Sequence, residues 1–166
     1  MEGLSKREVQ IIAWLEFYKK YFFTVDDVAQ FFTSKTQRYN TIKRLVRKKR
    51  IVKLNKKKYY LVPIKAKSGS WTERSFILVD EICDGKDYVI GMWNAANYWQ
   101  LTDQIPFQVD VFTTRRQGTY KILNTRIVFH RATRKKIDRA VVERIGDHTF
   151  RIQYKSESKQ WVKFID

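Results

Sequence analysis

The amino-acid sequence predicts an α+β protein built from two small domains. Its 166 residues are 43% apolar and 15% aromatic, which supplies enough apolar surface for one or two cores and argues against disorder. The hydrophobic period changes along the chain, from three helices and a hairpin to a mixture of helices and strands. Between these parts, residues 65–71 are mostly small or polar, as in a linker. We therefore place the domains at residues 1–67 and 68–166.

The first domain begins with a helix predicted over about residues 5–20. Ser5 and Glu8 have the spacing of a capping box. Apolar residues then recur on one helical face, at Ile11, Leu15, Tyr18 and Phe22. Thr24 is the predicted N-cap of a second helix, whose first turn holds two aspartates where the helix dipole favours negative charge. These two helices are expected to form the scaffold of the domain.

A third helix is predicted from its cap at Ser34 to about Lys49. Its core side is defined by the apolar residues Ile42, Leu45 and Val46. The opposite side collects basic and amide side chains, which can form paired hydrogen bonds with base edges in the major groove of DNA. The residues that we predict to read bases are Thr36, Gln37, Asn40, Lys43, Arg44 and Arg47.

Strand-like alternation follows over residues 51–62 and is interrupted by Asn55 and three lysines, which predicts a hairpin. Three helices followed by a hairpin is the order of a winged helix-turn-helix, and we predict that fold for the first domain. The hairpin tip of such a domain contacts phosphates without reading sequence. The residues predicted to contact the DNA backbone are Ser34, Lys35, Arg38, Lys48, Lys53, Lys56, Lys57 and Lys58.

The distribution of charge also indicates a polyanionic partner. From Val28 to Thr72 the chain has fourteen Lys or Arg residues and no acidic residue, whereas an ordinary solvated surface mixes both signs. Eighteen basic and five acidic side chains give the first domain a formal charge of +13, while sixteen and twelve give the second +4. We expect double-stranded DNA as the partner, bound mainly by the first domain. A membrane surface is less favoured, because no amphipathic apolar face is left over.

The second domain is predicted to be α+β with a mostly antiparallel sheet. A helix starts at Thr72 and Glu73 and ends before Asp84-Gly85. An extended piece at residues 88–90 and a helix at 92–99 follow. Alternating patterns then predict strands at residues 107–112, 120–123, 126–129, 140–145 and 148–154.

The run YVIGMWNAANYWQLTDQIP, from Tyr88 to Pro106, and the strand after it resemble the AbiEi-type antitoxins of abortive-infection systems. In that family an extended "YI(S/G)" piece leads into a helix, a "GLT-x-QIP" turn and a strand, and a winged helix-turn-helix precedes them. The resemblance covers about residues 5–130. Gln100 stands where the family usually has Gly. The matching motif residues, which we expect mainly to shape a turn, are Gly91, Leu101, Thr102, Gln104, Ile105 and Pro106.

This resemblance implies a regulator that represses its own toxin-antitoxin operon through the N-terminal domain. It also implies that the C-terminal domain counters a nucleotidyltransferase-like toxin. The partners expected on this hypothesis are the chain's own promoter DNA, such a toxin and a second copy of the chain in a homodimer.

Catalysis, metal binding and cofactor binding find little support in the sequence, and we expect none of them. His130 and His148 lie in separate predicted strands without the spacing of metal ligands. Asp147 with Glu157-Ser158-Lys159 forms a loose D…ExK pattern, which leaves a Mg²⁺-dependent nuclease as a minor alternative. An RNA-binding module is the other alternative, since bases could stack on the aromatic residues Trp93, Tyr98, Trp99 and Phe107.

The sequence predicts a cytoplasmic protein without a membrane segment. Lys6, Arg7 and Glu8 interrupt any apolar run at the N-terminus, and no window approaches the ~18 apolar residues of a membrane helix. Cys83 is the only cysteine, which excludes an internal disulfide and fits a reducing compartment.

Overall fold

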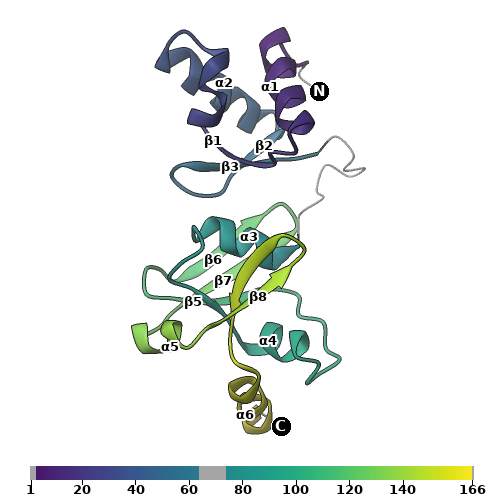
Figure 1. Ribbon diagram of the computed structural model, residues 1–166, viewed down its shortest axis with the longest axis vertical. Coiled ribbons are helices and arrows are strands. Elements are labelled where there is room, and N and C mark those ends of the chain that lie inside the picture. Colours follow the sequence, from purple (N-terminus) through teal and green to yellow (C-terminus); the bar gives the residue numbers. More distant parts are fainter. Residues whose placement is uncertain (1–2, 64–73, 166) are drawn as a thin grey trace. The chain divides into compact units, whose positions relative to one another are not determined.

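The computed structural model describes residues 3–63 and 74–165 and has a mixed α+β fold (Figure 1). The chain divides into two compact units, Met1–Trp71 (unit 1) and Thr72–Asp166 (unit 2). The predicted linker at residues 65–71, the predicted boundary after residue 67 and the helix start expected at Thr72 and Glu73 lie outside the described residues.

Unit 1 combines helices with a three-stranded sheet. Its elements are helix α1 (Lys6–Phe17), strand β1 (Phe22–Thr24), 3-10 helix η1 (Asp26–Phe31), helix α2 (Lys35–Arg47), and strands β2 (Ile51–Lys53) and β3 (Lys58–Leu61). The sheet order is β1-β3-β2, and both pairs are antiparallel. The predicted hairpin forms, with Ile51 paired to Leu61 and Lys53 paired to Tyr59.

Helix α1 starts as predicted but ends earlier. Ser5 Oγ accepts a hydrogen bond from the Glu8 amide at 3.3 Å, and Glu8 Oε2 accepts one from the Ser5 amide at 2.7 Å, which completes the capping box. Lys19 takes a left-handed φ of +53°, and the Lys20 amide donates to the Leu15 carbonyl at 2.8 Å. This arrangement closes the helix. Tyr18, expected in the core, is therefore exposed.

The expectation that Thr24 caps a second helix is wrong. Thr24 ends strand β1, in which Phe23 pairs with Tyr59 of β3. The Asp27 carboxylate accepts hydrogen bonds from the Thr24 amide at 2.7 Å and from Thr24 Oγ1 at 3.0 Å. Asp27 belongs to the short helix η1, which begins at Asp26 and whose N-cap Val25 makes no side-chain hydrogen bond.

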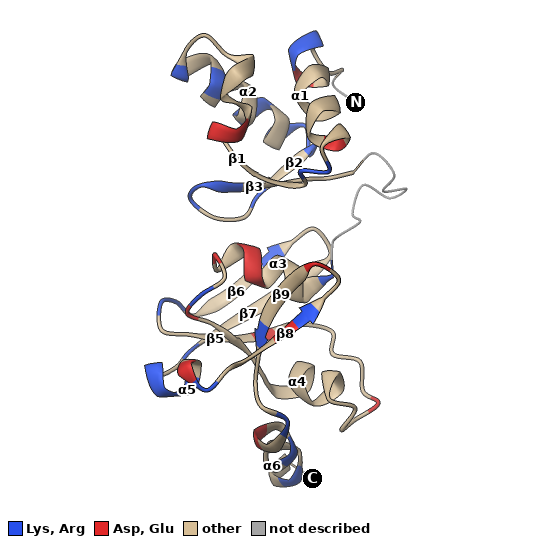
Figure 2. Ribbon diagram, viewed as in Figure 1, with Lys and Arg blue, Asp and Glu red and all other residues tan. Residues whose placement is uncertain are grey.

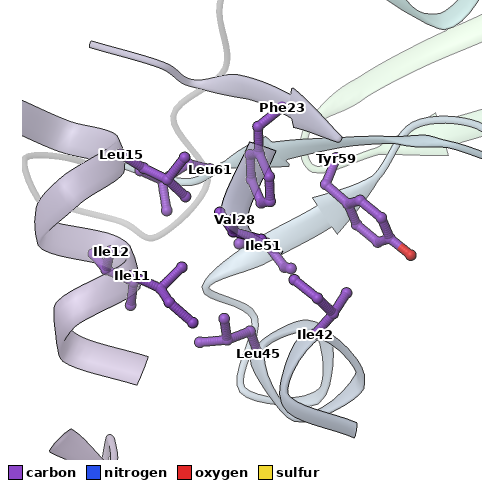
Figure 3. Close-up of a cluster of buried hydrophobic side chains, with 10 residues drawn as sticks. All are labelled: Ile11, Ile12, Leu15, Phe23, Val28, Ile42, Leu45, Ile51, Tyr59 and Leu61. Atoms are coloured by element: carbon purple, nitrogen blue, oxygen red, sulfur yellow. The ribbon is translucent and has the colours of Figure 1, made fainter. Parts of the chain in front are cut away.

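One apolar core holds the helices of unit 1 against its sheet (Figure 3). Its buried side chains are Ile11, Ile12, Leu15, Phe23, Val28, Ile42, Leu45, Ile51, Tyr59 and Leu61. Val46 was expected in this core, but it is exposed, and Thr41 is buried instead. The buried face of α2 is thus rotated toward Thr41, because the sheet and α1 contact that side of the helix.

Unit 2 contains a six-stranded mixed sheet with four helices among the described residues. The elements are α3 (Ser75–Ile82), β4 (Val89–Ile90), α4 (Met92–Tyr98), β5 (Val109–Thr113), β6 (Gly118–Ile122), β7 (Thr125–Arg131), α5 (Arg134–Asp138), β8 (Val141–Ile145), β9 (His148–Ile152) and α6 (Lys155–Ile165). The strand order is β6-β7-β5-β4-β9-β8. Pairs β5–β7 and β4–β9 are parallel and the other three are antiparallel, so the sheet is mixed, with antiparallel pairs in the majority as predicted.

Helices α5 and α6 were not predicted from the sequence. Helix α6 packs on α4, where the rings of Trp93 and Trp161 meet edge to face with centroids 4.9 Å apart. Cys83 follows α3 and is buried, and this burial raises the pKa of its thiol to about 12. In the part of the chain that the structure describes, no helix is long and apolar enough to cross a membrane.

Candidate nucleic-acid interface

Helix α2 presents all six predicted base-reading residues on its exposed side. Ser34 caps the helix, since its hydroxyl accepts a hydrogen bond from the Gln37 amide at 3.2 Å. The exposed residues are Thr36, Gln37, Asn40, Lys43, Arg44 and Arg47. No acidic residue occurs in the first turn of the helix. Figure 2 shows Lys and Arg along α2.

Two further exposed side chains were not singled out from the sequence. Tyr39 is 66% exposed on α2, but it is three positions before the core residue Ile42 and therefore lies beside the apolar stripe of the helix. Arg7 of α1 donates to Gln37 Oε1 at 3.3 Å, and the Thr33 hydroxyl donates to the same oxygen at 3.0 Å. Arg7 therefore adds a cation beside the first turn of α2.

Arg44 is only half exposed, because part of its guanidinium group is held inside unit 1. Its Nε lies 3.5 Å from Glu8 Oε1, and one terminal nitrogen donates to Thr41 Oγ1 at 3.1 Å. The side chain is thus fixed in one orientation by contacts with α1 and with its own helix. Any base contact by Arg44 would use the remaining edge of the guanidinium group.

Lys48 was predicted to contact a DNA phosphate, but the structure places it in a buried ion pair. Its Nζ lies 2.8 Å from Glu8 Oε2 and 2.7 Å from the Gly3 carbonyl oxygen, and its side chain is 10% exposed. Burial alone would raise the pKa of Glu8, but hydrogen bonds from Lys48 and from the Ser5 amide hold it below its usual value. Glu8 is therefore a charged, fully buried partner, and Lys48 can meet a phosphate only by leaving it.

Arg38, which was also predicted to contact the DNA backbone, is instead paired with a carboxylate of unit 1. One of its terminal nitrogens lies 3.3 Å from the carboxylate of Asp26, and most of the side chain is covered. Ser34 and Lys35 lie beside it at the exposed start of α2, where the helix dipole favours an anion.

The hairpin tip is shaped by one asparagine. Asn55 Oδ1 accepts hydrogen bonds from the backbone amides of Lys57 and Lys58, each at 2.9 Å. This turn leaves Lys56 and Lys57 exposed, together with Lys53 on β2, whereas Lys58 is half-buried. Three of the four predicted hairpin lysines are thus accessible to a phosphate.

Positive and negative side chains are partly separated within unit 1, although the side chain of Asp26 is 91% exposed. Three carboxylates pair with cations other than the base-reading candidates: Glu8 with Lys48, Asp26 with Arg38, and Asp27 with Lys20 at 2.7 Å. Arg44 is the exception, because it also faces Glu8. Within residues 3–63, carboxylates form no ion pair with Lys35, Lys43, Lys53, Lys56 or Lys57.

Residues 88–106, singled out in the sequence for their resemblance to a family motif, lie around α4 in unit 2. Gly91 precedes the helix, and a Cβ at this position would stand 2.7 Å from the Phe112 ring and 2.8 Å from Gln153 Oε1, so a side chain does not fit there. Gln100 closes the helix with a left-handed φ of +58°, while the Leu101 amide donates to the Ala96 carbonyl at 2.9 Å.

The loop after α4 combines internal hydrogen bonds with exposed apolar side chains. The Asn97 side-chain amide donates to the carbonyl oxygen of Gln104 at 2.9 Å, and the Gln104 amide donates to Thr102 Oγ1 at 3.2 Å. Leu101 and Pro106 are half-buried. Ile105 and Phe107 are 89% and 85% exposed. The motif therefore contains turn-forming residues and one projecting apolar side chain, Ile105.

The residues on which the RNA-binding and nuclease alternatives depend mostly contact other side chains of unit 2 or lie apart from one another. Trp93, Tyr98 and Trp99 contact other aromatic rings within unit 2, while Phe107 is exposed. Glu157 of the D…ExK pattern lies 3.3 Å from Arg139. His130 and His148 each contact a separate carboxylate, Asp110 and Glu81 respectively. Over the described residues, no group of three or more His, Cys, Asp or Glu side chains could hold a metal ion.

Comparison with known proteins finds neither a protein-family model nor a curated protein that matches the sequence.

Proposed function

We propose that unit 1 is a winged helix-turn-helix domain that binds double-stranded DNA, and that the protein is a sequence-specific transcriptional regulator of its own promoter. The separation of charge in unit 1 is the observation that supports this proposal most strongly. Cations and amides occupy the exposed side of α2 and the hairpin tip, while Glu8, Asp26 and Asp27 pair with Lys48, Arg38 and Lys20, and Arg44 also faces Glu8. Duplex DNA, with one negative charge about every 1.7 Å, matches such a surface.

Helix α2 would serve as the recognition helix. Asn40, Lys43 and Arg47 recur at the spacing of successive turns on its exposed side. Asn can donate to and accept from adenine, and Arg can donate twice to guanine, so this side can distinguish base pairs in the major groove. The start of the helix, which lacks an acidic residue, can receive a backbone phosphate.

The β2–β3 hairpin would serve as the wing. Lys53, Lys56 and Lys57 are exposed on it, and the Asn55 turn holds the tip in one conformation. Ammonium groups are strong but unselective phosphate ligands, so the wing contributes affinity and α2 contributes sequence preference.

The resemblance of residues 88–106 to the AbiEi-type antitoxins extends this proposal to unit 2. Unit 2 would counter a nucleotidyltransferase-like toxin encoded beside this protein, with the loop around Ile105 as a contact. The whole protein would then be an autorepressing antitoxin of a phage-defence operon. It would act in the cytoplasm without enzymatic activity, and a homodimer would suit a palindromic operator.

The DNA-binding proposal is tested by titrating the full chain with the DNA upstream of its own gene and with random duplex. If about five exposed cations each displace one counterion, log Kobs should fall against log salt concentration with a slope of about −4 to −5. Footprinting should show a protected site in the upstream DNA. A flat salt response, or equal affinity for both duplexes, would contradict the proposal.

The antitoxin proposal needs a separate experiment. Co-expression of the full chain with the neighbouring toxin gene should restore growth. A variant with Ile105→Ser should restore less growth while keeping its DNA affinity, because Ile105 lies in unit 2 and contributes no charge. If the full chain fails to restore growth, the protein remains a proposed DNA-binding regulator without an antitoxin role.

A further inference from the structure

A second cluster of cations lies in unit 2, where two parallel strands end side by side. Strands β5 and β7 run parallel, and Thr113 at the end of β5 is in register with Arg131 at the end of β7. The segments that follow these strands carry Arg115 and Arg134. Both arginines face the same carboxylate, that of Asp87.

Asp87 is a buried anchor for this pair. Its Oδ2 accepts a hydrogen bond from the Thr114 hydroxyl at 2.7 Å and forms an ion pair with Arg115, whose Nε lies 2.9 Å away. A terminal nitrogen of Arg134 lies 3.4 Å from Oδ1. Burial alone would raise the pKa of Asp87, but the Thr114 hydrogen bond and the two arginines hold it below its usual value. Asp87 is therefore ionised, and it fixes both guanidinium groups.

The arginines keep donors that Asp87 does not use. Arg115 contacts Asp87 through Nε, which leaves its terminal nitrogens, and the side chains of Arg115 and Arg134 are 46% and 63% exposed. Asp87 Oδ1 accepts no hydrogen bond in the described structure, so Arg134 is oriented without being fully engaged. One carboxylate therefore faces two guanidinium groups, which leaves a net positive charge.

Further charged side chains of both signs lie nearby, since Asp80 and Asp84 as well as Arg115 and Arg116 act electrostatically on the thiol of Cys83. Arg116 covers the ring of Phe129, with its guanidinium carbon 4.6 Å from the ring centroid. Arg131 and Lys135 are exposed beside the pair in sequence. Figure 2 shows Lys and Arg at α5, whose first residue is Arg134.

We propose that Arg115 and Arg134, held by Asp87, form a phosphate-binding site on unit 2. Guanidinium groups fixed by a carboxylate bind phosphate with paired hydrogen bonds, and their fixed orientation lowers the entropy cost of binding. The phosphates of a nucleic-acid backbone and of a free nucleotide share this chemistry. The site depends on unit 2 alone and therefore goes beyond the proposed role of unit 1.

The site is tested on the isotope-labelled full chain by following the side-chain Nε–H signals of its arginines. The probes are inorganic phosphate, AMP and a short duplex of random sequence. The signals of Arg115 and Arg134 should shift and saturate, while those of the exposed controls Arg126 on β7 and Arg144 on β8 should not. Arg47 reports on unit 1 in the same spectra, so each proposal succeeds or fails by its own signals.

The probes also identify the source of the phosphate. Saturation by duplex at lower concentration than by AMP assigns the site to the nucleic-acid backbone, and the reverse order assigns it to a free nucleotide. Equal shifts of the control arginines, or no shift with any probe, would overturn the site.

Two variants separate a built site from diffuse charge. Arg134→Lys keeps the charge but loses the planar donors, and it should weaken phosphate binding roughly tenfold, whereas Arg144→Lys should change it little. Asp87→Asn should also weaken binding, although it removes a negative charge. Stronger binding by Asp87→Asn, or no effect of Arg134→Lys, would overturn the proposal. Because Arg134 is exposed, its variant carries the test even if Asp87→Asn does not fold.

Discussion

The carboxylate of Glu8 lies 2.8 Å from the ammonium group of Lys48, and this contact joins the start of α1 to the residue that ends α2. Both side chains are buried, and Glu8 also accepts the Ser5 amide at the cap of α1. The ion pair therefore fixes how α2 is rotated against α1. This buried contact, which lies away from the proposed DNA surface, therefore determines which side of α2 is exposed to DNA.

Lys48→Met should lower the free energy of unfolding of unit 1 by about 3 kcal/mol, because it removes the hydrogen-bonded cation of the buried Glu8 and leaves only Arg44, at 3.5 Å, facing that carboxylate. Lys43→Met, on the exposed side of the same helix, should change it by less than about 0.5 kcal/mol. Urea denaturation followed by the NMR signals of unit 1 measures both. DNA affinity should show the opposite preference, with the larger loss for Lys43→Met. Equal destabilisation by the two variants would contradict a structural role for Lys48.

Acid should destabilise unit 1 through Glu8. Because its pKa is lower in the folded state than in the unfolded state, the folded chain binds fewer protons. This stabilisation is fully present above the ordinary value of 4.5 and is lost as the pH falls through the folded value. Thermal melting of Glu8→Gln should start lower at neutral pH and fall less between about pH 5 and 2. A variant that follows the wild-type slope would contradict this assignment. The pKa values of Asp27 and Asp87 are also lowered in the folded chain, so the variant should retain some loss of stability in acid.

Replacing residues of α2 and of the wing should have different effects on specificity. Asn40→Ala and Arg47→Ala should cost roughly 1 to 3 kcal/mol on the upstream site and little on random duplex. Lys56→Ala and Lys57→Ala should weaken binding to both duplexes alike. Fluorescence anisotropy with the two duplexes measures this difference. If the α2 variants lose equal affinity on both, this side of α2 contacts phosphates and does not read bases.

Gln100→Gly should stabilise unit 2 by about 0.5–1 kcal/mol, because glycine accepts a left-handed φ without steric cost. The same substitution at Gln160, inside helix α6, should destabilise by about 1 kcal/mol. Thermal melting of the two variants should therefore move in opposite directions. A lower melting temperature for Gln100→Gly would contradict the backbone explanation.

The starts of α1 and α2 could be predicted from the sequence, whereas the residues on which these two helices close could not. Ser5 and Ser34 cap residues only three positions away, and both caps form as the spacing indicates. Helices α1 and α2 close on Lys19 and Lys49, which have left-handed φ values of +53° and +57°. Glycine is the usual signal for this conformation, and neither lysine provides it.

The helical period likewise predicts the exposed side of α2 but not the partners of its cations. The six base-reading candidates are exposed as expected, since a wheel requires only the spacing of Ile42 and Leu45. The partner of Lys48 is 40 residues away, and nothing near Lys48 indicates it. Strand β1 was missed for the same reason, because Phe23 becomes a strand residue only by pairing with Tyr59. Long-range contacts decided these positions.

Cys83 can serve as a probe for the opening of unit 2, because its thiol is unreactive while the unit is folded. Cys83 is buried at the end of α3, and its raised pKa, about 12, keeps the thiol protonated at neutral pH. A thiol-labelling reagent can therefore react only when unit 2 opens. Because the chain has no other thiol, the labelling rate measures the opening of unit 2 without any contribution from unit 1. The native sequence thus carries its own probe for the stability of one unit in the presence of the other.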